Sequence, residues 1–279
     1  MPLKTTDLTP SIGTRIDTDV ATLVSGTASA EIAELVQKRG VVLIRGLRMD
    51  DEQQLAFTNT LGPLLSEKSG EVYKVTYDPR HSPQLYFYTP GNFFWHIDRT
   101  DSDIPPFITI LNAKQLPADG GGDTEFANTY AAYEALPEAD KRLIERLRVI
   151  HRVADSFRFV PNLSDEQIAA FAAHDPKNHP LVWRHHNGRR SLILSTSGKE
   201  LEGMGKTEGE ALLDRLMAFA TQPQFVYRHQ WQLGDVVMWD NTGTMHRAMP
   251  YAEDSGRLLH RTTVLGEEPF DTERHLVAA

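Results

Sequence analysis

The sequence predicts a mainly β domain with helices packed around the outside. Short runs of β-branched and aromatic residues recur along most of the chain, and Gly-, Pro- and Asn-rich turns separate them. Apolar residues follow helical spacing in only a few places, for example over residues 30–36. No internal repeat, linker or low-complexity block divides the 279 residues, so a single domain over residues 1–279 is expected.

Composition excludes several functional classes. Hydrophobic residues make up 40% of the chain and charged residues 24%, which is enough for a core and ordinary for a folded protein. The net charge of -9, with no run of Lys and Arg, argues against a nucleic-acid partner. The chain has no cysteine, which excludes disulfides, thiolate metal sites and a cysteine nucleophile. No apolar run reaches the length of a membrane span and no signal peptide is visible, so a cytoplasmic protein without a membrane partner is expected.

The N-terminal part alternates helices and a strand. Residues 30–36 have helical spacing, and Gly40 is a suitable stop for that helix. Residues 41–44 are all aliphatic and predict a buried strand. Asp50 or Asp51 can cap the helix that follows.

Aromatic residues dominate the next three predicted strands. They cover residues 72–77, which include Tyr73, then residues 85–88 and 93–95. Two interpretations stay open for these rings, since they can be paired core residues or the wall of a substrate pocket.

The middle of the chain contains a glycine-rich turn. A strand over residues 107–111 precedes Asp119 to Thr124, which lacks both the Lys of a phosphate-binding loop and a complete dinucleotide motif. We therefore interpret this turn as the entry of a strand that positions Thr124. A helix over residues 130–147 should break and restart at Pro137.

Residues 155–180 form an excursion bounded by prolines, and it is either a lid over a site or a surface segment without a role. Residues 181–194 then predict a hairpin that turns at Asn187 and Gly188. Because adjacent strand residues face opposite ways, His185 and His186 cannot easily bind one metal, and we expect them at the surface. Thr207 and Glu210 fit a helix capping box.

The candidate chemistry centres on His96 and Asp98. If a strand carries residues 94–99, both side chains project from one face. An imidazole and a carboxylate side by side can hold a divalent metal. A second histidine, His246, follows far downstream in the segment 239–247.

Four motifs, in this order and spacing, resemble the TauD/TfdA family of Fe(II)- and 2-oxoglutarate-dependent dioxygenases. They are His96-x-Asp98, residues 121–124, the stretch from Trp239 to Ala248, and the stretch from Arg257 to Thr263. The resemblance extends from residue 40 to residue 266.

The resemblance implies a double-stranded β-helix, that is, a jelly roll with a cupin-like core. It implies Fe(II) on a facial triad of His96, Asp98 and His246, with open positions for the co-substrates 2-oxoglutarate and O2. The implied reaction hydroxylates a small organic substrate while 2-oxoglutarate is decarboxylated to succinate and CO2. Halogenases of the family lack the carboxylate ligand, so the presence of Asp98 favours hydroxylation.

The resemblance also assigns roles outside the triad. Arg257 is expected to bind the distal carboxylate of 2-oxoglutarate through its planar fork, assisted by the hydroxyl of Thr124. Asn92, Arg261 and Tyr73 are expected on the substrate side, although Arg261 can equally serve the co-substrate or a structural carboxylate. Asp240 and Asn241 are either supports for His246 or a turn-forming pair.

The substrate itself is open. The taurine-oxidising branch has an extra substrate-binding histidine upstream of the metal motif, where this chain offers only His81 among Tyr and Phe. That argues against taurine, and it allows a bulkier or aromatic carboxylate or sulfonate, or a neutral lipophilic compound. The family implies a homo-oligomer, either a dimer or a tetramer. Two rival functions remain at this level: a zinc hydrolase on the same triad, and a non-catalytic jelly-roll binding protein.

Overall fold

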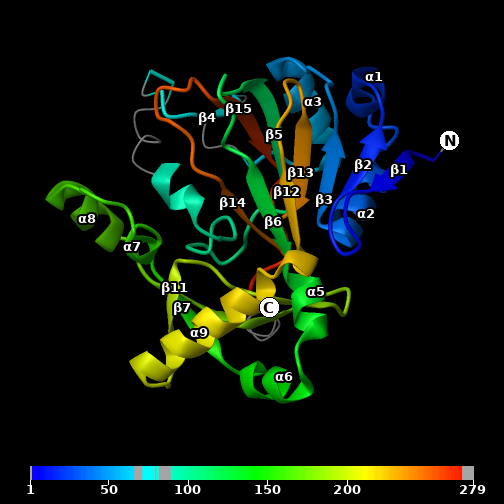
Figure 1. Ribbon diagram of the computed structural model, residues 1–279. Helices are drawn as coiled ribbons and strands as arrows, with labels where there is room; N and C mark the ends of the chain where they lie inside the picture. The colour runs from blue at the N-terminus through cyan, green and yellow to red at the C-terminus, as the bar shows by residue number, and fades with distance from the viewer. Residues whose placement is uncertain (1, 66–70, 79, 82–88, 272–279) are drawn as a thin grey trace.

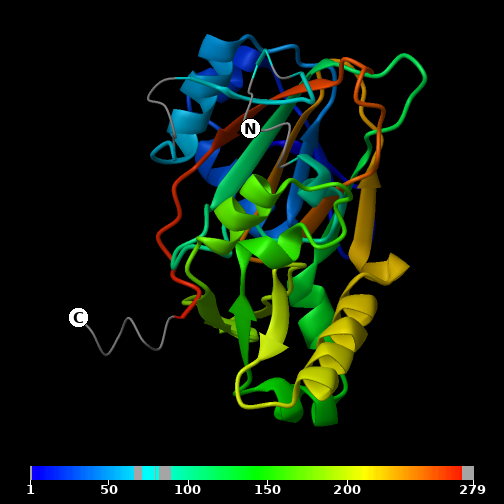
Figure 2. The same cartoon turned by 90° about the vertical axis from the view of Figure 1, so that its left-hand side faces the viewer.

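A computed structural model describes residues 2–65, 71–78, 80–81 and 89–271 of the chain. Its upper part is a sandwich of two β-sheets with helices on one side, and a smaller lobe of helices and short strands lies below it (Figures 1 and 2).

The larger sheet has seven strands. In sheet order they are β1 (Lys4–Asp7), β2 (Thr14–Asp17), β3 (Val41–Ile44), β13 (Val236–Asp240), β5 (Ile108–Gln115), β15 (Leu258–Thr263) and β4 (Tyr73–Val75). All neighbours pair antiparallel except β2 and β3. Neighbours in the sheet that are distant in sequence, such as β13 beside β3, give the crossed connectivity of a jelly roll.

The smaller sheet faces the larger one. Its order is β12 (Val226–His229), β6 (Thr124–Asn128) and β14 (Thr244–Ala248). Leu43, Leu111 and Trp239 of the larger sheet pack with Phe126 of the smaller sheet in one buried cluster. That cluster fills part of the space between the two sheets, and the candidate site described below lies in the remaining part.

Helices cover the outer face of the larger sheet. They are α1 (Val20–Val24), α2 (Ser29–Arg39) and α3 (Asp51–Leu61). The alternate residues of the buried strands, such as Val42 and Met238, point to this side and pack on Ile32, Val36 and Phe57. The uninterrupted apolar sequence of β3 is explained by this burial of both sheet faces.

The lower lobe is inserted between β6 and β12. It contains the sheet β11 (Gly198–Leu201), β7 (Arg148–His151), β8 (Lys177–Pro180) and the hairpin β9 (Val182–Arg184) with β10 (Arg190–Leu192). Its helices are α5 (Thr129–Ala135), α6 (Glu138–Ile144), α7 (Val153–Ser156), α8 (Asp165–Ala172) and α9 (Lys206–Ala220). Two short 3-10 helices, η1 (Thr89–Phe93) and η2 (Pro223–Phe225), complete the described elements.

Most local predictions are confirmed. Gly40 ends α2 with φ 73°, Asp50 caps α3 with a complete capping box, and Pro137 separates α5 from α6. The hairpin turns at Gly188, which has φ 83°.

Two local predictions are wrong. The helix after Met204 starts at Lys206 with Gly205 as its N-cap, so Thr207 lies inside the first turn and caps nothing. Residues 93–99 form no strand, which corrects both the strand predicted over 93–95 and the one considered over 94–99. Phe93 ends the 3-10 helix η1, and of residues 94–99 only His96 makes a β-bridge. The strand predicted over residues 85–88 lies outside the described residues.

No helix among the described residues is both long enough and apolar enough to cross a lipid bilayer.

Candidate metal centre and active site

A reciprocal pair of backbone hydrogen bonds brings two distant histidines together. The amide of His96 donates to the carbonyl of His246 over 3.0 Å, and the amide of His246 donates to the carbonyl of His96 over 2.9 Å. Directly bridged residues project from the same face, so the two imidazoles lie side by side with centroids 4.2 Å apart. The pairing anchors the loop after η1 to β14, although 150 positions separate these residues in the sequence.

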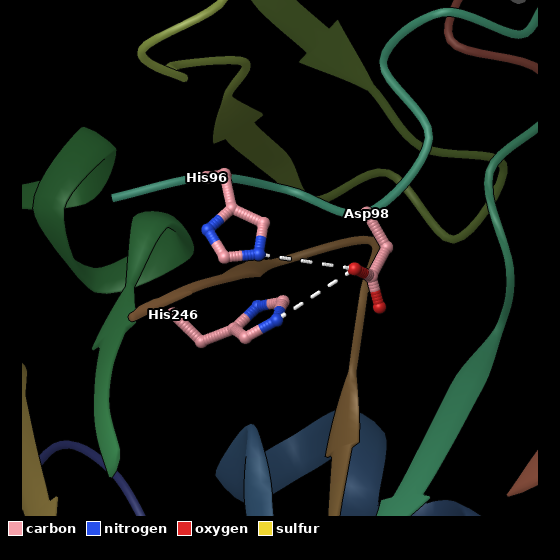
Figure 3. A group of neighbouring side chains, drawn as sticks. All are labelled: His96, Asp98 and His246. Carbon is pink, nitrogen blue, oxygen red and sulfur yellow. Dashed lines mark ion pairs between the residues drawn. The ribbon is translucent and has the colours of Figure 1, made fainter. Parts of the chain in front are cut away.

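Asp98 completes a cluster of three ligand atoms (Figure 3). Its Oδ1 lies 3.9 Å from His96 Nε2 and 3.7 Å from His246 Nε2. One ligand atom from each residue lies within 4.8 Å of the others. The three atoms are therefore close enough together to serve as ligands of one metal ion.

The protonation states of the cluster also suit a cation. His96 Nδ1 lies 2.7 Å from the carbonyl of Phe94, which can only accept, so Nδ1 is the donor and Nε2 is the nitrogen that faces the cluster. Burial, followed by the charge of His96, lowers the pKa of His246 to about 3, so this ring is neutral near pH 7. Burial alone would raise the pKa of Asp98, but the neighbouring imidazole of His246, the permanent charge of Arg261, the imidazole of His96 and the hydrogen bond from Thr109 bring it below its ordinary value. Two imidazole nitrogens and an ionised carboxylate therefore face one point, which is a donor set suited to a divalent metal.

A chain of hydrogen bonds holds Asp98 from behind. Thr109 Oγ1 donates to Asp98 Oδ2 over 3.0 Å, Asn241 Nδ2 donates to Thr109 Oγ1 over 2.8 Å, and Trp239 Nε1 donates to Asn241 Oδ1 over 3.0 Å. Thr109 thus occupies Oδ2 of the carboxylate and leaves Oδ1 facing the two histidines. Asn241 thus supports Asp98 rather than His246, while Asp240 accepts from the amide and hydroxyl of Thr242 in a turn.

A buried cation and a hydroxyl lie further along the smaller sheet. In the register of β6 and β14, His246 pairs with Phe126 and Ala248 pairs with Thr124, so Thr124 and His246 share one sheet face. Arg257 is 2% exposed and its Nη2 donates to the carbonyl of Gly122 over 2.8 Å. Its Nε has no hydrogen-bond partner among the described residues.

Gly122 makes room for this arginine. The residue has φ 68°, and a Cβ there would lie only 2.5 Å from Arg257 Nε. Thr124, two positions later, accepts a hydrogen bond from Trp231 Nε1 over 3.0 Å. Trp231, which the sequence did not single out, follows β12 by two residues and reaches Thr124 because β12 pairs with β6 at His229 and Thr124.

The residues predicted on the substrate side fall into two groups. Arg261 lies over the ring of Tyr73 at 4.3 Å, across the paired strands β15 and β4, and its charge lowers the pKa of Asp98. Asn92, in η1, lines a cavity of about 220 Å³ together with His96 and Asp98. The structure thus brings the charge of Arg261 near Asp98, stacks Arg261 on Tyr73, and places Asn92 in the wall of the cavity.

One prediction about the remaining histidines needs correction. His185 is buried rather than at the surface, because it leaves its strand toward Ser191 and Glu268, to which its nitrogens lie within 2.8 and 3.2 Å. His186 is exposed as expected, and its Nδ1 lies 4.0 Å from Glu268 Oε1. Among the described residues, the group of three possible metal ligands is His96, Asp98 and His246, without the doublet.

The fold and the cluster define a class, namely jelly-roll proteins with two histidines and one carboxylate converging in the sandwich. Comparison with known proteins narrows it. The sequence matches the family described as "Taurine catabolism dioxygenase TauD, TfdA family" over residues 4–263. The chain is 33% identical over 269 residues to the alpha-ketoglutarate-dependent 2,4-dichlorophenoxyacetate dioxygenase of Cupriavidus pinatubonensis, covering 90% of this chain and 93% of that protein.

Two further relatives agree. The (S)-phenoxypropionate/alpha-ketoglutarate-dioxygenase of Sphingobium herbicidovorans is 30% identical over 232 residues, covering 79% of this chain and 80% of that protein. The crystal structure of AAD-2 in complex with Mn(II) and N-oxalylglycine superposes with a TM-score of 0.81 at 30% identity, covering 96% of this chain and 99% of that chain.

The chain therefore belongs to the TauD/TfdA family. It is an oxidoreductase, a dioxygenase that depends on 2-oxoglutarate (alpha-ketoglutarate), Fe(II) and O2. The family, the jelly-roll fold and the enzyme class expected from the sequence are confirmed.

Proposed function

We propose that the enzyme hydroxylates a small organic anion, with an aryloxyalkanoate or a similar aromatic carboxylate as the leading class. O2 supplies one oxygen atom to the substrate and one to 2-oxoglutarate, which leaves as succinate and CO2. The observation that carries the proposal is the convergence of His96, Asp98 and His246 beside a cavity of about 220 Å³.

In this proposal the triad holds Fe(II) on one face. Bound Fe(II) supplies the redox chemistry that activates O2, and the protein supplies the fixed ligand positions. His96 is oriented by the carbonyl of Phe94, and Asp98 is held ionised by its neighbours. The sheet and the aromatic rings around His246 exclude water from that side.

Arg257 and Thr124 bind the distal carboxylate of 2-oxoglutarate in this proposal. Arg257 is buried without a carboxylate partner among the described residues, so a bound anion would satisfy a charge that is costly to bury alone. Trp231 is a donor only, so its hydrogen bond leaves the Thr124 proton free to point at that anion.

In this proposal the substrate would occupy the cavity beside His96 and Asp98. Asn92 lines the cavity, and Arg261, supported by Tyr73, adds positive charge near the triad. Two relatives are named for acting on 2,4-dichlorophenoxyacetate and (S)-phenoxypropionate, which are both aryloxyalkanoates. That similarity favours an aromatic carboxylate over taurine and over a neutral substrate.

The excursion over residues 155–180 is proposed as the cover of this cavity. Phe157 is stacked on Phe171 and lies so close to Gly91 that a Cβ there would meet its ring at 2.8 Å. Ser156 and Phe157 both line the cavity. Slower amide exchange over 155–172 upon adding substrate to the N-oxalylglycine complex is expected, and unchanged exchange would remove the cover role.

Succinate formation tests the proposed function. Purified protein with Fe(II), ascorbate and 2-oxoglutarate should release succinate when phenoxyacetate, 2-phenoxypropionate or a related carboxylate is added. Zn(II) should not replace Fe(II), since a zinc hydrolase would act without 2-oxoglutarate. Substrate turnover with Zn(II) alone would support the zinc hydrolase. Substrate binding without any turnover would support the non-catalytic binding protein.

We propose that the protein acts in the cytoplasm as a homodimer or homotetramer without nucleic-acid or membrane partners. The net charge of -9 and the absence of cysteine support these assignments. Light scattering of the purified protein and fractionation of cells that produce it are the corresponding measurements.

A further inference from the structure

The wall of the cavity beside the triad contains Arg99, to which the proposed function gives no role. The wall comes from the loop around Asn92 and Asp98, from the start of α7, and from Thr196 and Ser197. Arg99 lines it directly after Asp98 in the chain. The wall of the cavity therefore contains a permanent positive charge on the residue that directly follows Asp98.

The guanidinium of Arg99 has no partner within the described ranges. Only its backbone carbonyl is used, as acceptor for the amide and hydroxyl of Ser102. Arg152 also lines the cavity, but its Nη2 is paired with Glu200 over 2.8 Å. Asp101 lines the cavity as well and forms no ion pair with Arg99. Of the two arginines in the wall, Arg99 is therefore the one available to a ligand.

Its backbone conformation adds a second observation. Arg99 has φ 57°, in the left-handed region that favours glycine or asparagine. An arginine at such a position is strained, and strain of this kind clusters at ligand-binding residues. The turn places a long cationic side chain at the exposed edge of the cavity instead of a residue that would fit the backbone better.

Arg261 has a different position. It is stacked on Tyr73, its charge acts on Asp98, and it is absent from the described residues of the cavity wall. The two arginines therefore meet different parts of a bound molecule.

We propose that Arg99 binds the anionic group of the substrate where the cavity meets solvent, and that it makes the enzyme selective for anions. This rests on the proposed function, since it assumes that the cavity receives the substrate. In an aryloxyacetate the carbon next to the ether oxygen also carries the carboxylate. A reacting carbon held near the triad would thus place its carboxylate within a short distance of the residue that follows Asp98.

The test compares binding of an anion and its neutral analogue. Wild-type protein loaded with Mn(II) and N-oxalylglycine is titrated calorimetrically with phenoxyacetate, 2-phenoxypropionate, hexyl sulfate and hexanesulfonate. The tightest anion is then compared with an uncharged analogue, which is phenoxyacetamide in the case of phenoxyacetate. Arg99→Gln, Arg99→Lys and the control Arg48→Gln are measured in the same way.

Arg48 is a matched control, because it is also exposed and left-handed, with φ 50°, but does not line the cavity. Arg99→Gln should raise the Kd of the anion about tenfold, because it removes a charge-assisted contact that solvent partly screens. The Kd of the uncharged amide should stay within about twofold of its wild-type value. Arg99→Lys should retain part of the affinity, and Arg48→Gln should match wild type. The anion affinity of wild type should also fall as salt is raised.

Three results would overturn the proposal. They are anion binding by Arg99→Gln equal to wild type, an equal loss for the anion and the amide, and failure of wild type to bind any of the four anions. Binding of N-oxalylglycine is measured separately. If wild-type protein does not bind N-oxalylglycine, that result contradicts the proposed 2-oxoglutarate site instead.

Discussion

Replacing Thr109 by valine tests how the structure holds its proposed metal carboxylate. Thr109 is fully buried, and its hydroxyl links Asp98 Oδ2 to Asn241 Nδ2. Valine has nearly the same shape but removes the donor to Asp98 and the acceptor for Asn241. The carboxylate would keep its charge and lose the bond that fixes its orientation.

The magnitude follows from the two lost bonds. A hydrogen bond to a charged group contributes about 1.5–3 kcal/mol, and partners behind a metal ligand typically change metal affinity about 10- to 100-fold. Thr109→Val should therefore raise the apparent Kd for Mn(II) by about 10- to 100-fold. The unpaired amide of Asn241 should lower the free energy of unfolding of the metal-free protein by about 1–3 kcal/mol.

Calorimetric titration of the metal-free protein with Mn(II) at pH 7, with urea unfolding alongside, separates the two effects. Thr109→Ser retains the hydroxyl and should keep most of the metal affinity. Thr58→Val removes another fully buried hydroxyl, bonded to Thr262 at 2.7 Å, and should lower stability without changing Mn(II) affinity. A Thr109→Val protein that binds Mn(II) within twofold of wild type would refute the reasoning.

Four other changes test the remaining parts of the site. Arg257→Gln should weaken N-oxalylglycine binding by about 100-fold without changing Mn(II) affinity, and an unchanged Kd would move that role elsewhere. Trp231→Phe should weaken N-oxalylglycine binding several-fold in wild type but not in a Thr124→Val background, because both changes remove the same hydrogen bond. Equal losses of affinity in both backgrounds would mean that Trp231 has only a structural role. Asp98→Ala should abolish succinate formation, and full activity would contradict the triad. Burial raises the pKa of Asp240 from 3.8 to about 6, so the folded state holds this proton more tightly than the unfolded state does. The free energy of unfolding should therefore fall by about 3 kcal/mol as pH rises between those two values. Asp240→Asn should flatten this fall in urea unfolding, and an unchanged pH profile would contradict the assignment.

Features that depend on a few neighbouring residues, such as the ends of helices, could be predicted from the sequence. Gly40 ends a helix because only a residue tolerant of positive φ fits there, and Pro137 interrupts one because it lacks an amide proton. Thr207 misled for the same local reason, because the capping pattern was present but the chain enters the helix two residues earlier.

Contacts that depend on strand register were not predictable in this way. The order of the motifs identified His96 and His246, but their mutual backbone hydrogen bonds arise only when β14 meets the loop after η1. Asn241 was expected behind His246 or in a turn, and it reaches Asp98 through Thr109 instead. The sequence offers one hint, which is that the polar Thr109 stands between Ile108 and Ile110 at the start of β5.

The substrate side depends even more on tertiary structure. Nothing in the local sequence separates Arg99 from Arg152, since the difference lies in the partner at Glu200. The left-handed φ of Arg99 is likewise set by the turn that follows Asp98.

Visible absorption during anaerobic addition of Fe(II) and then 2-oxoglutarate tests the central claim most directly. Wild-type protein should develop a weak charge-transfer band that requires both additions, and His96→Ala should not. The absence of the band from wild-type protein with bound iron, or an equal band in His96→Ala, would contradict the proposed centre of His96, Asp98 and His246.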